Sequence, residues 1–248
     1  MSSDTTVVLV HGAWCKPTIF SPLLPYLSGY NTIAPALPSV GCAPDSESMK
    51  SWQPDIQAAS DAIVKALQRS THEKVVVVSH SYAGIVCSEA LQYVSVADRS
   101  RVRHVILQGV LVDVGQAVVL DPTQPPPPTW RVENGLCWPG MPKEALLHDF
   151  SQEEQEKWLK ELDYIPELVA YQPLTHAAQY DFETTYVVAE DDKVMSAEIQ
   201  DFLVATANEK GAGIRTERIN CGHMTFIRMP EKVADIIKKV AGDGQWTV

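Results

Sequence analysis

Ser81 stands in the hexapeptide SHSYAG, between two segments of different pattern. The residues before it, Lys74 to Val78, predict a buried strand, and those from Tyr82 to about Val94 predict a helix. A serine at a sharp strand-to-helix turn is typical of a nucleophile elbow, in which small residues two positions before and after let the backbone pack closely. Here Ser79 and Ala83 take those positions in place of two glycines. Because serine is also a good N-cap, the hexapeptide alone leaves a purely structural role open.

His223 is the histidine best placed to act as a base for Ser81. It follows Gly222 on a predicted loop, after the predicted strand Ile214 to Ile219 and before the last predicted helix. A histidine on such a late loop can reach an upstream serine and take its proton. His11 directly follows the first predicted strand. The remaining histidines lie in predicted helices or strands or beside Ser81, and all of them precede the acid proposed below: His72, His80, His104, His148 and His176.

Three consecutive carboxylates, Glu190, Asp191 and Asp192, end another predicted strand, Thr184 to Ala189. One of them is expected to accept a hydrogen bond from Nδ1–H of the histidine and to stabilise the imidazolium. These residues alone leave the choice among the three open, and Asp113 is a further candidate. The order serine, acid, histidine is that of α/β hydrolases.

The residues His11-Gly12-Ala13-Trp14 directly follow the first predicted strand, Thr5 to Val10. In this arrangement the backbone N–H groups of Ala13 and Tyr82 are expected to form an oxyanion hole. Gly12 permits the sharp turn that brings this loop toward the serine.

Four segments together carry a resemblance that covers essentially the whole chain: HGAW, SHSYAG, TTYVVAEDD, and GHM followed by a helix that starts with proline. The sequence resembles the compact branch of α/β hydrolases that contains plant methyl-ester esterases and hydroxynitrile lyases. In that family the acid lies six residues after a tyrosine, so Tyr186 points to Asp192. The resemblance also implies that the central insertion is a helical cap over the site. The residues expected to bind substrate are Trp14, Trp130, Trp138, Trp158 and Met224.

Short β-branched runs alternate with segments of helical period, which predicts an α/β core with a mainly parallel sheet flanked by helices. We expect one domain, 1–248, with its core formed by 1–115 and 181–248 and a helical cap at about 116–180. The cap begins near the proline-rich segment Gln124 to Trp130, which cannot be helix interior or central strand because proline lacks the donor N–H. Ser151 and Glu154 predict a capping box at the start of a helix.

The composition excludes several classes of protein. With 45% hydrophobic and 21% charged residues over 248 positions, the chain is typical of a globular protein rather than a disordered one. A net charge of −11 without a basic cluster argues against a nucleic-acid partner. No apolar run reaches membrane-spanning length, no secretory signal pattern begins the chain, and the five cysteines have no metal-binding spacing. We therefore expect a soluble cytoplasmic protein. Acyl transfer through a serine nucleophile needs no metal or organic cofactor, so none is expected, and the sequence leaves a homodimer open.

The main hypothesis is a serine hydrolase that cleaves a carboxylic ester or lactone through an acyl-enzyme intermediate. A hydroxynitrile-lyase-like reaction is the first alternative, but those relatives have threonine and lysine where this chain has Gly12 and Met224. Cyclase-type chemistry, or a small-molecule receptor on the same scaffold, are further alternatives, since a fold alone does not determine function.

Overall fold

A six-stranded parallel sheet forms the centre of the protein. The computed structural model describes residues 4–69, 73–118, 123 and 125–242. The strand order is β2-β1-β3-β4-β8-β9, and all five neighbouring pairs are parallel. The strands are β1 (Thr5–Val10), β2 (Asn31–Ile33), β3 (Lys74–Ser81), β4 (Val102–Gly109), β8 (Thr184–Ala189) and β9 (Arg215–Ile219). The predicted mainly parallel sheet is confirmed.

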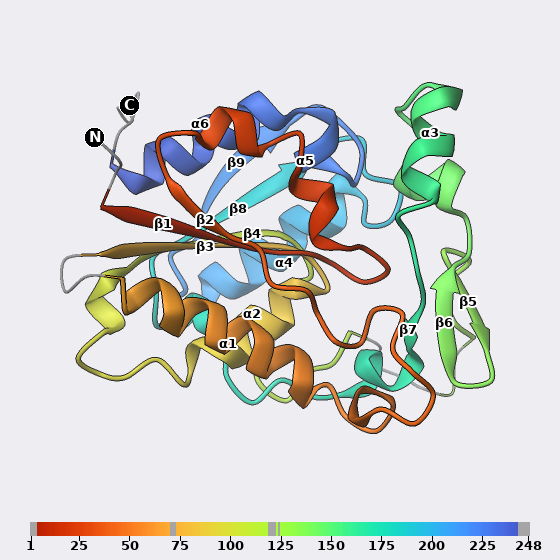
Figure 1. Cartoon of the computed structure of the whole chain (residues 1–248), viewed down its shortest axis with the longest axis horizontal. Coiled ribbons are helices and arrows are strands. Elements are labelled where there is room, and N and C mark those ends of the chain that lie inside the picture. The colour runs from red at the N-terminus through yellow and green to blue at the C-terminus, as the bar shows by residue number, and fades with distance from the viewer. Residues whose placement is uncertain (1–3, 70–72, 119–122, 124, 243–248) are drawn as a thin grey trace.

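Helices cover both faces of this sheet (Figure 1). The helices α1 and α2 pack together beneath β1 and β3 in the view of Figure 1, whereas α5 and α6 lie above them. The helix α4 packs against β8. Their bounds are α1 (Gln53–Leu67), α2 (Ala83–Leu91), α4 (Ala197–Glu209), α5 (Thr225–Arg228) and α6 (Pro230–Ala241).

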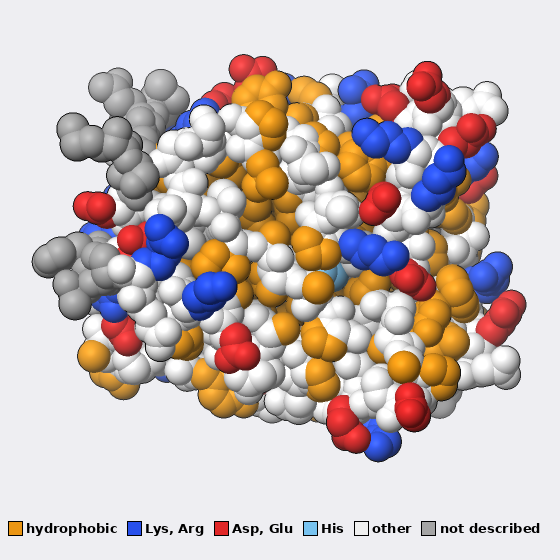
Figure 2. All heavy atoms as spheres, in the orientation of Figure 1, with side chains coloured by type: hydrophobic (Ala, Val, Ile, Leu, Met, Phe, Trp, Pro, Cys, Tyr) orange, Lys and Arg blue, Asp and Glu red, His pale blue; other side chains and the backbone are white. Residues whose placement is uncertain are grey.

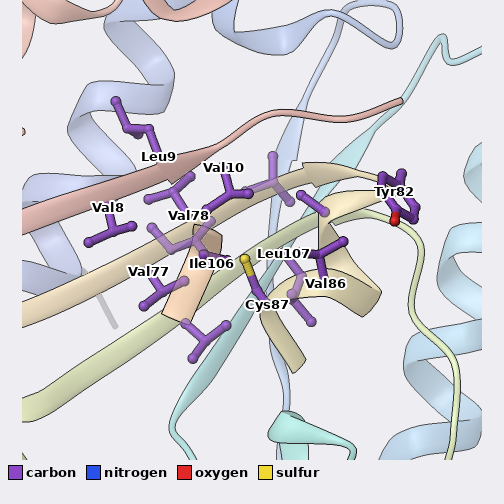
Figure 3. Packing of buried hydrophobic residues seen from close by; sticks show 14 of the residues in the cluster. Val8, Leu9, Val10, Val77, Val78, Tyr82, Val86, Cys87, Ile106 and Leu107 are labelled. Atoms are coloured by element: carbon purple, nitrogen blue, oxygen red, sulfur yellow. The ribbon is translucent and has the colours of Figure 1, made fainter. Parts of the chain in front are cut away.

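The central strands are buried on both faces, as their continuous β-branched sequences predict. Every residue of β1 and most of β3 are buried. Val8 and Leu9 point to opposite faces of the sheet, and Val86 and Cys87 of α2 lie beside Leu107 of β4 (Figure 3). This packing gives the carboxyl ends of β1 and β3 a rigid base, and both functional loops leave the sheet there.

The expectation of a wholly helical insertion is wrong. Residues from about 130 to 166 include a three-stranded antiparallel sheet, in the order β5-β6-β7, alongside one α-helix. Its strands are β5 (Trp130–Glu133), β6 (Leu136–Pro139) and β7 (Ile165–Pro166), and the helix is α3 (Gln152–Leu159). The sequence does carry the signal for the hairpin: Asn134 and Gly135 have φ of 53° and 74°, as a two-residue turn of type I′ requires.

Local backbone preferences explain three smaller outcomes. The segment between β1 and β2 forms two short 3₁₀ helices, Pro17–Phe20 and Leu24–Leu27, rather than one continuous α-helix, because prolines interrupt the α-helical hydrogen bonds. Residues 125–128 of the proline-rich segment are neither helix nor strand, as predicted, and Gln124 lies outside the described residues. The capping box of Ser151 and Glu154 is present at the start of α3.

The surface carries mixed charge. On the face drawn in Figure 2, acidic and basic side chains are interspersed, and several of both signs gather over α3. Within the described residues, no helix combines the length and the apolar character needed to cross a membrane.

Candidate active site

Ser81 occupies a strained turn between β3 and α2. Its φ of 54° lies in the left-handed region that a non-glycine residue adopts rarely, and α2 begins two residues later at Ala83. Glycines make room for the turn: a Cβ on Gly12 would lie 2.8 Å from Cβ of Ser81, and one on Gly109 would lie 2.6 Å from its Cα. The chain thus forms the sharp elbow, although its flanking positions are Ser79 and Ala83.

His223 is hydrogen-bonded to Asp192 through a buried pair of side chains. Nδ1 of His223 lies 2.7 Å from Oδ2 of Asp192, and the residues are 2% and 4% exposed. Burial by itself raises the pKa of Asp192, but the His223 ring and the N–H groups of Val194 and Met195 outweigh it and lower the pKa overall. The ionised carboxylate can only accept, so Nδ1 is the donor, and in the neutral ring this leaves Nε2 with its lone pair.

The other candidate acids have different partners. Asp191 pairs with Nε2 of His148 at 2.9 Å and with Lys193, on the protein surface. Glu190 accepts a hydrogen bond from Arg218 at 2.9 Å, and Asp113 pairs with Lys210 at 2.6 Å. Of the four, the structure brings Asp192 to His223.

A pocket of about 260 Å³ contains both Ser81 and His223. Ala13 and Tyr82, whose N–H groups were expected to form the oxyanion hole, line the same pocket. Its remaining walls come from both the core and the insertion and are mainly apolar: Trp14, Val110, Val118, Pro127, Thr129, Trp130, Ile165, Val169, Ala170, Val194 and Met195. Such a pocket suits a small molecule with an apolar body.

Two of the five expected substrate-binding residues line this pocket, Trp14 and Trp130. Their rings pack edge to face with centroids 6.4 Å apart, and the indole N–H of Trp14 donates to the carbonyl of Cys137 in the insertion at 2.9 Å. The loop after β1 is thereby joined to the insertion at the pocket that contains Ser81.

Trp138, Trp158 and Met224 are not among the described residues that line the pocket, which corrects the expectation for all three. Trp138 packs against Tyr164 at a centroid distance of 4.8 Å. Trp158 and Met224 are buried in the hydrophobic core, at 6% and 2% exposure. These three side chains therefore contribute to internal packing.

Val194 and Met195 line the pocket, although sequence reasoning did not single them out. Their N–H groups both donate to Oδ1 of Asp192, at 2.7 and 3.1 Å. The signal was their position directly after the acid, where a turn that satisfies the carboxylate must bring them back toward the histidine.

Buried polar contacts hold the elbow from behind. His80 donates from Nε2 to the carbonyl of His223 at 3.2 Å, and burial lowers the pKa of His80 to about 3, so its ring is neutral. The hydroxyl of Tyr82 donates to Oδ2 of Asp55 at 2.9 Å, and Asp55 also accepts from the hydroxyl and the N–H of Ser39. Neighbours of Ser81 on both sides are thus attached to other parts of the core.

Metal-ligating side chains are not gathered anywhere in the described ranges 4–69, 73–118, 123 and 125–242: no three histidine, cysteine or acidic residues lie together in a metal-binding cluster. The five cysteines are buried free thiols.

Comparison with known proteins agrees with this architecture. A model of the alpha/beta hydrolase family matches residues 7–236. The alpha/beta hydrolase nvfD of Aspergillus novofumigatus is 26% identical, over 96% of each chain. Polyneuridine aldehyde esterase superposes with a TM-score of 0.74 at 15% identity, covering 97% of this chain and 100% of its own. A pyrethroid hydrolase from Sphingobium faniae JZ-2 superposes with a TM-score of 0.71 at 19% identity, covering 96% and 97%.

Proposed function

Because the chain belongs to the alpha/beta hydrolase family, we propose that it is a serine hydrolase that cleaves a carboxylic ester or lactone. The observation that carries the proposal is the buried hydrogen bond of 2.7 Å between His223 and Asp192, in the loops that face the pocket of Ser81. Two of the structurally similar proteins, the polyneuridine aldehyde esterase and the pyrethroid hydrolase, are named for hydrolytic activity, which supports the same class of reaction.

In the proposed reaction, Nε2 of His223 takes the hydroxyl proton of Ser81 while Oγ attacks the ester carbonyl. The N–H groups of Ala13 and Tyr82 stabilise the oxyanion of the tetrahedral intermediate. The carbon–oxygen bond of the ester then breaks, and the leaving alkoxide takes the proton from His223. A water molecule then gives a proton to His223 and attacks the acyl carbonyl. The bond between the acyl carbon and Oγ breaks, and His223 returns the proton to Oγ, which releases the carboxylic acid and restores Ser81.

Asp192 acts in this scheme by keeping Nδ1 of His223 protonated and its ring fixed. Its other oxygen is already held by two backbone N–H groups, so the carboxylate cannot turn away without losing them. The ionised acid also stabilises the imidazolium that forms when Ser81 loses its proton.

The hydroxynitrile-lyase alternative meets a steric objection at position 12. Relatives with that activity have threonine there, whereas any Cβ at Gly12 would lie 2.8 Å from Cβ of Ser81 and 2.9 Å from the carbonyl oxygen of His80. At position 224, the charged lysine of those relatives is replaced by a methionine that is 2% exposed. No cationic group is thereby supplied at that position to stabilise cyanide.

The test compares Ser81→Ala with Ser60→Ala, which alters a serine on α1. Wild type and Ser60→Ala are expected to hydrolyse nitrophenyl acetate and to be labelled by a fluorophosphonate, whereas Ser81→Ala is expected to do neither. Wild-type activity in Ser81→Ala would refute the proposal. Labelling of wild type without turnover of any ester or lactone would favour a receptor or a cyclase, and cyanide release from a cyanohydrin would favour a lyase.

A further inference from the structure

A second cavity, of about 300 Å³, lies beside the catalytic pocket. We call it the α4 cavity because one side of it is formed by α4, through Ile199, Phe202, Leu203, Thr206 and Ala207. Much of the remaining wall is apolar and follows the end of β4. Ile199 and Phe202 are 51% and 67% exposed, so large apolar groups surround it and remain open to water.

The α4 cavity and the catalytic pocket share part of their walls. Val110, Val118 and Met195 line both. The N–H of Val110 donates to the carbonyl of Ser81 at 3.3 Å, and the N–H of Met195 donates to Asp192 at 3.1 Å. The shared wall is therefore attached directly to the proposed nucleophile and acid, and it includes a methionine, whose flexible side chain can adapt to a ligand.

Gln179 adds a polar group to the wall of the α4 cavity. The residue is 2% exposed, and its Nε2 donates to the carbonyl of Val112 at 3.1 Å. Its Oε1 is enclosed by other protein atoms and has no hydrogen-bond partner among the described residues. Buried polar atoms are rarely left unpaired, so this acceptor is available to a ligand that donates a hydrogen bond once the Gln179 amide turns toward the cavity.

Charge at this cavity is already neutralised. Of the described residues that line it, Asp113 and Lys210 carry charge, and they pair with each other at 2.6 Å. The hydroxyl of Tyr180 also donates to Asp113, at 3.3 Å. A charged ligand would have to break this pair, so the cavity suits a neutral one.

We propose that the α4 cavity binds the part of the substrate that is remote from the scissile bond, a neutral apolar group that carries a hydroxyl. This inference rests on the proposed ester hydrolysis and names the class of ester. At about 260 Å³, the catalytic pocket is smaller than most pockets that hold a drug-sized molecule, which begin near roughly 300 Å³. When the Met195 side chain moves aside and the Gln179 amide turns toward the α4 cavity, a large hydroxylated ester occupies both spaces, and its hydroxyl donates to Oε1 of Gln179.

The first test varies the length of the substrate. Two series are used: nitrophenyl esters with acyl chains of increasing length, and acetate esters of alcohols of increasing length. In one of them, kcat/KM is expected to rise about threefold for each methylene that enters the α4 cavity. Ala207→Leu, which fills that cavity, should abolish the rise. Ala205→Leu is the matched control, because Ala205 is on the same helix, exposed, and not part of the lining.

The second test addresses Gln179. Each long ester is compared with its analogue that carries a terminal hydroxyl, in wild type and in Gln179→Met. Wild type should prefer one of the hydroxylated esters, and Gln179→Met should reduce that preference by about fivefold, the worth of one hydrogen bond. Because the measured quantity is a ratio of two substrates, a general loss of activity does not imitate this result.

The outcomes separate this inference from the proposed function. If nitrophenyl acetate is cleaved through Ser81 but all variants keep the wild-type dependence on length and hydroxylation, the α4 cavity proposal is overturned and the hydrolase proposal stands. If no ester is cleaved, the hydrolase proposal fails. Should Ala207→Leu fail to fold, the Gln179→Met ratio alone decides.

Discussion

The carboxylate of Asp149 accepts a hydrogen bond from the backbone N–H of Gly222, at 2.8 Å, one residue before His223. The neighbouring His148 contacts Asp191 at 2.9 Å, one residue before Asp192. Two adjacent residues of the insertion thus hold both loops that carry the buried histidine and acid. The insertion therefore positions this pair from outside the core, in addition to covering the pocket.

Asp149→Ala is expected to lower kcat by about tenfold with a smaller effect on KM, because the loop of His223 loses its anchor and misplacement of a reacting group costs rate. Steady-state kinetics with nitrophenyl acetate measures the effect. Asp149→Asn keeps an acceptor oxygen and should retain most of the activity. An equal loss in both variants would contradict a positioning role and point instead to the charge of Asp149.

Asp192→Asn is expected to lower kcat by about 10⁴-fold, because the amide cannot hold His223 in the required tautomer or stabilise its charge. Asp191→Asn should change kcat far less, since Asp191 is about half exposed and pairs with His148 and Lys193. The two variants carry the same chemical change at adjacent positions. Similar kcat values in both would therefore argue against Asp192 as the acid.

Gly12→Ala is expected to reduce kcat by at least about 100-fold, because the new Cβ would meet the Ser81 side chain and the His80 carbonyl and displace the oxyanion loop. Gly29→Ala is the matched control, since a Cβ there meets no atom within 4 Å. Circular dichroism and kinetics on both variants test this. Full activity in Gly12→Ala would show that the loop tolerates the shift.

Tyr82→Phe removes the hydroxyl that donates to Asp55 at 2.9 Å. Asp55 is fully buried and would lose one of three hydrogen bonds, so the free energy of unfolding should fall by about 1–3 kcal/mol. Urea denaturation measures it, with Tyr93→Phe as a control because Tyr93 is 57% exposed. An unchanged midpoint in Tyr82→Phe would mean that Asp55 finds another donor.

Acidification should destabilise the protein through buried neutral histidines. Burial lowers the pKa of His11 to about 4, although a hydrogen bond to the Gly12 carbonyl opposes part of this shift. In the unfolded chain, a histidine titrates near 6.5. Between these values the unfolded chain binds more protons. The contribution of His11 to the free energy of unfolding is therefore complete above pH 6.5 and is lost as the pH drops toward 4. Between pH 7 and pH 5 this loss is about 2 kcal/mol.

Urea denaturation at pH 7 and pH 5 tests this pH dependence. His11→Gln is expected to be less stable than wild type at pH 7, because His11 accepts from the N–H of Leu37 at 3.1 Å. Between pH 7 and pH 5, the free energy of unfolding of His11→Gln should nevertheless fall by about 2 kcal/mol less than that of wild type. An equal loss in both proteins would show that His11 does not titrate in this range.

The core of the fold could be predicted from local pattern. The β-branched runs at Thr5 to Val10 and Lys74 to Val78 are buried strands, and the stripe of Ile56, Ala59 and Ile63 is the buried side of α1. A segment that is buried on both faces has a composition of its own, so neighbours in the sequence suffice to identify it. The insertion was harder, because its Asn134-Gly135 turn signal competes with nearby charged segments of helical character.

The sequence by itself determined which residues can react and in which order they occur, because a small-residue elbow, a loop glycine and a post-strand acid are local features. Tertiary structure decided which acid contacts His223, which tryptophans reach the pocket, and that Asp149 and Met195 lie beside the loops of His223 and Asp192. These outcomes depend on contacts between segments far apart in the chain, such as Asp149 with Gly222, 73 residues away. The residue types alone left the acid open until the family resemblance pointed to Asp192. The contact of Asp149 with Gly222 has no such signal in the sequence, because only the packing of the insertion against the core creates it.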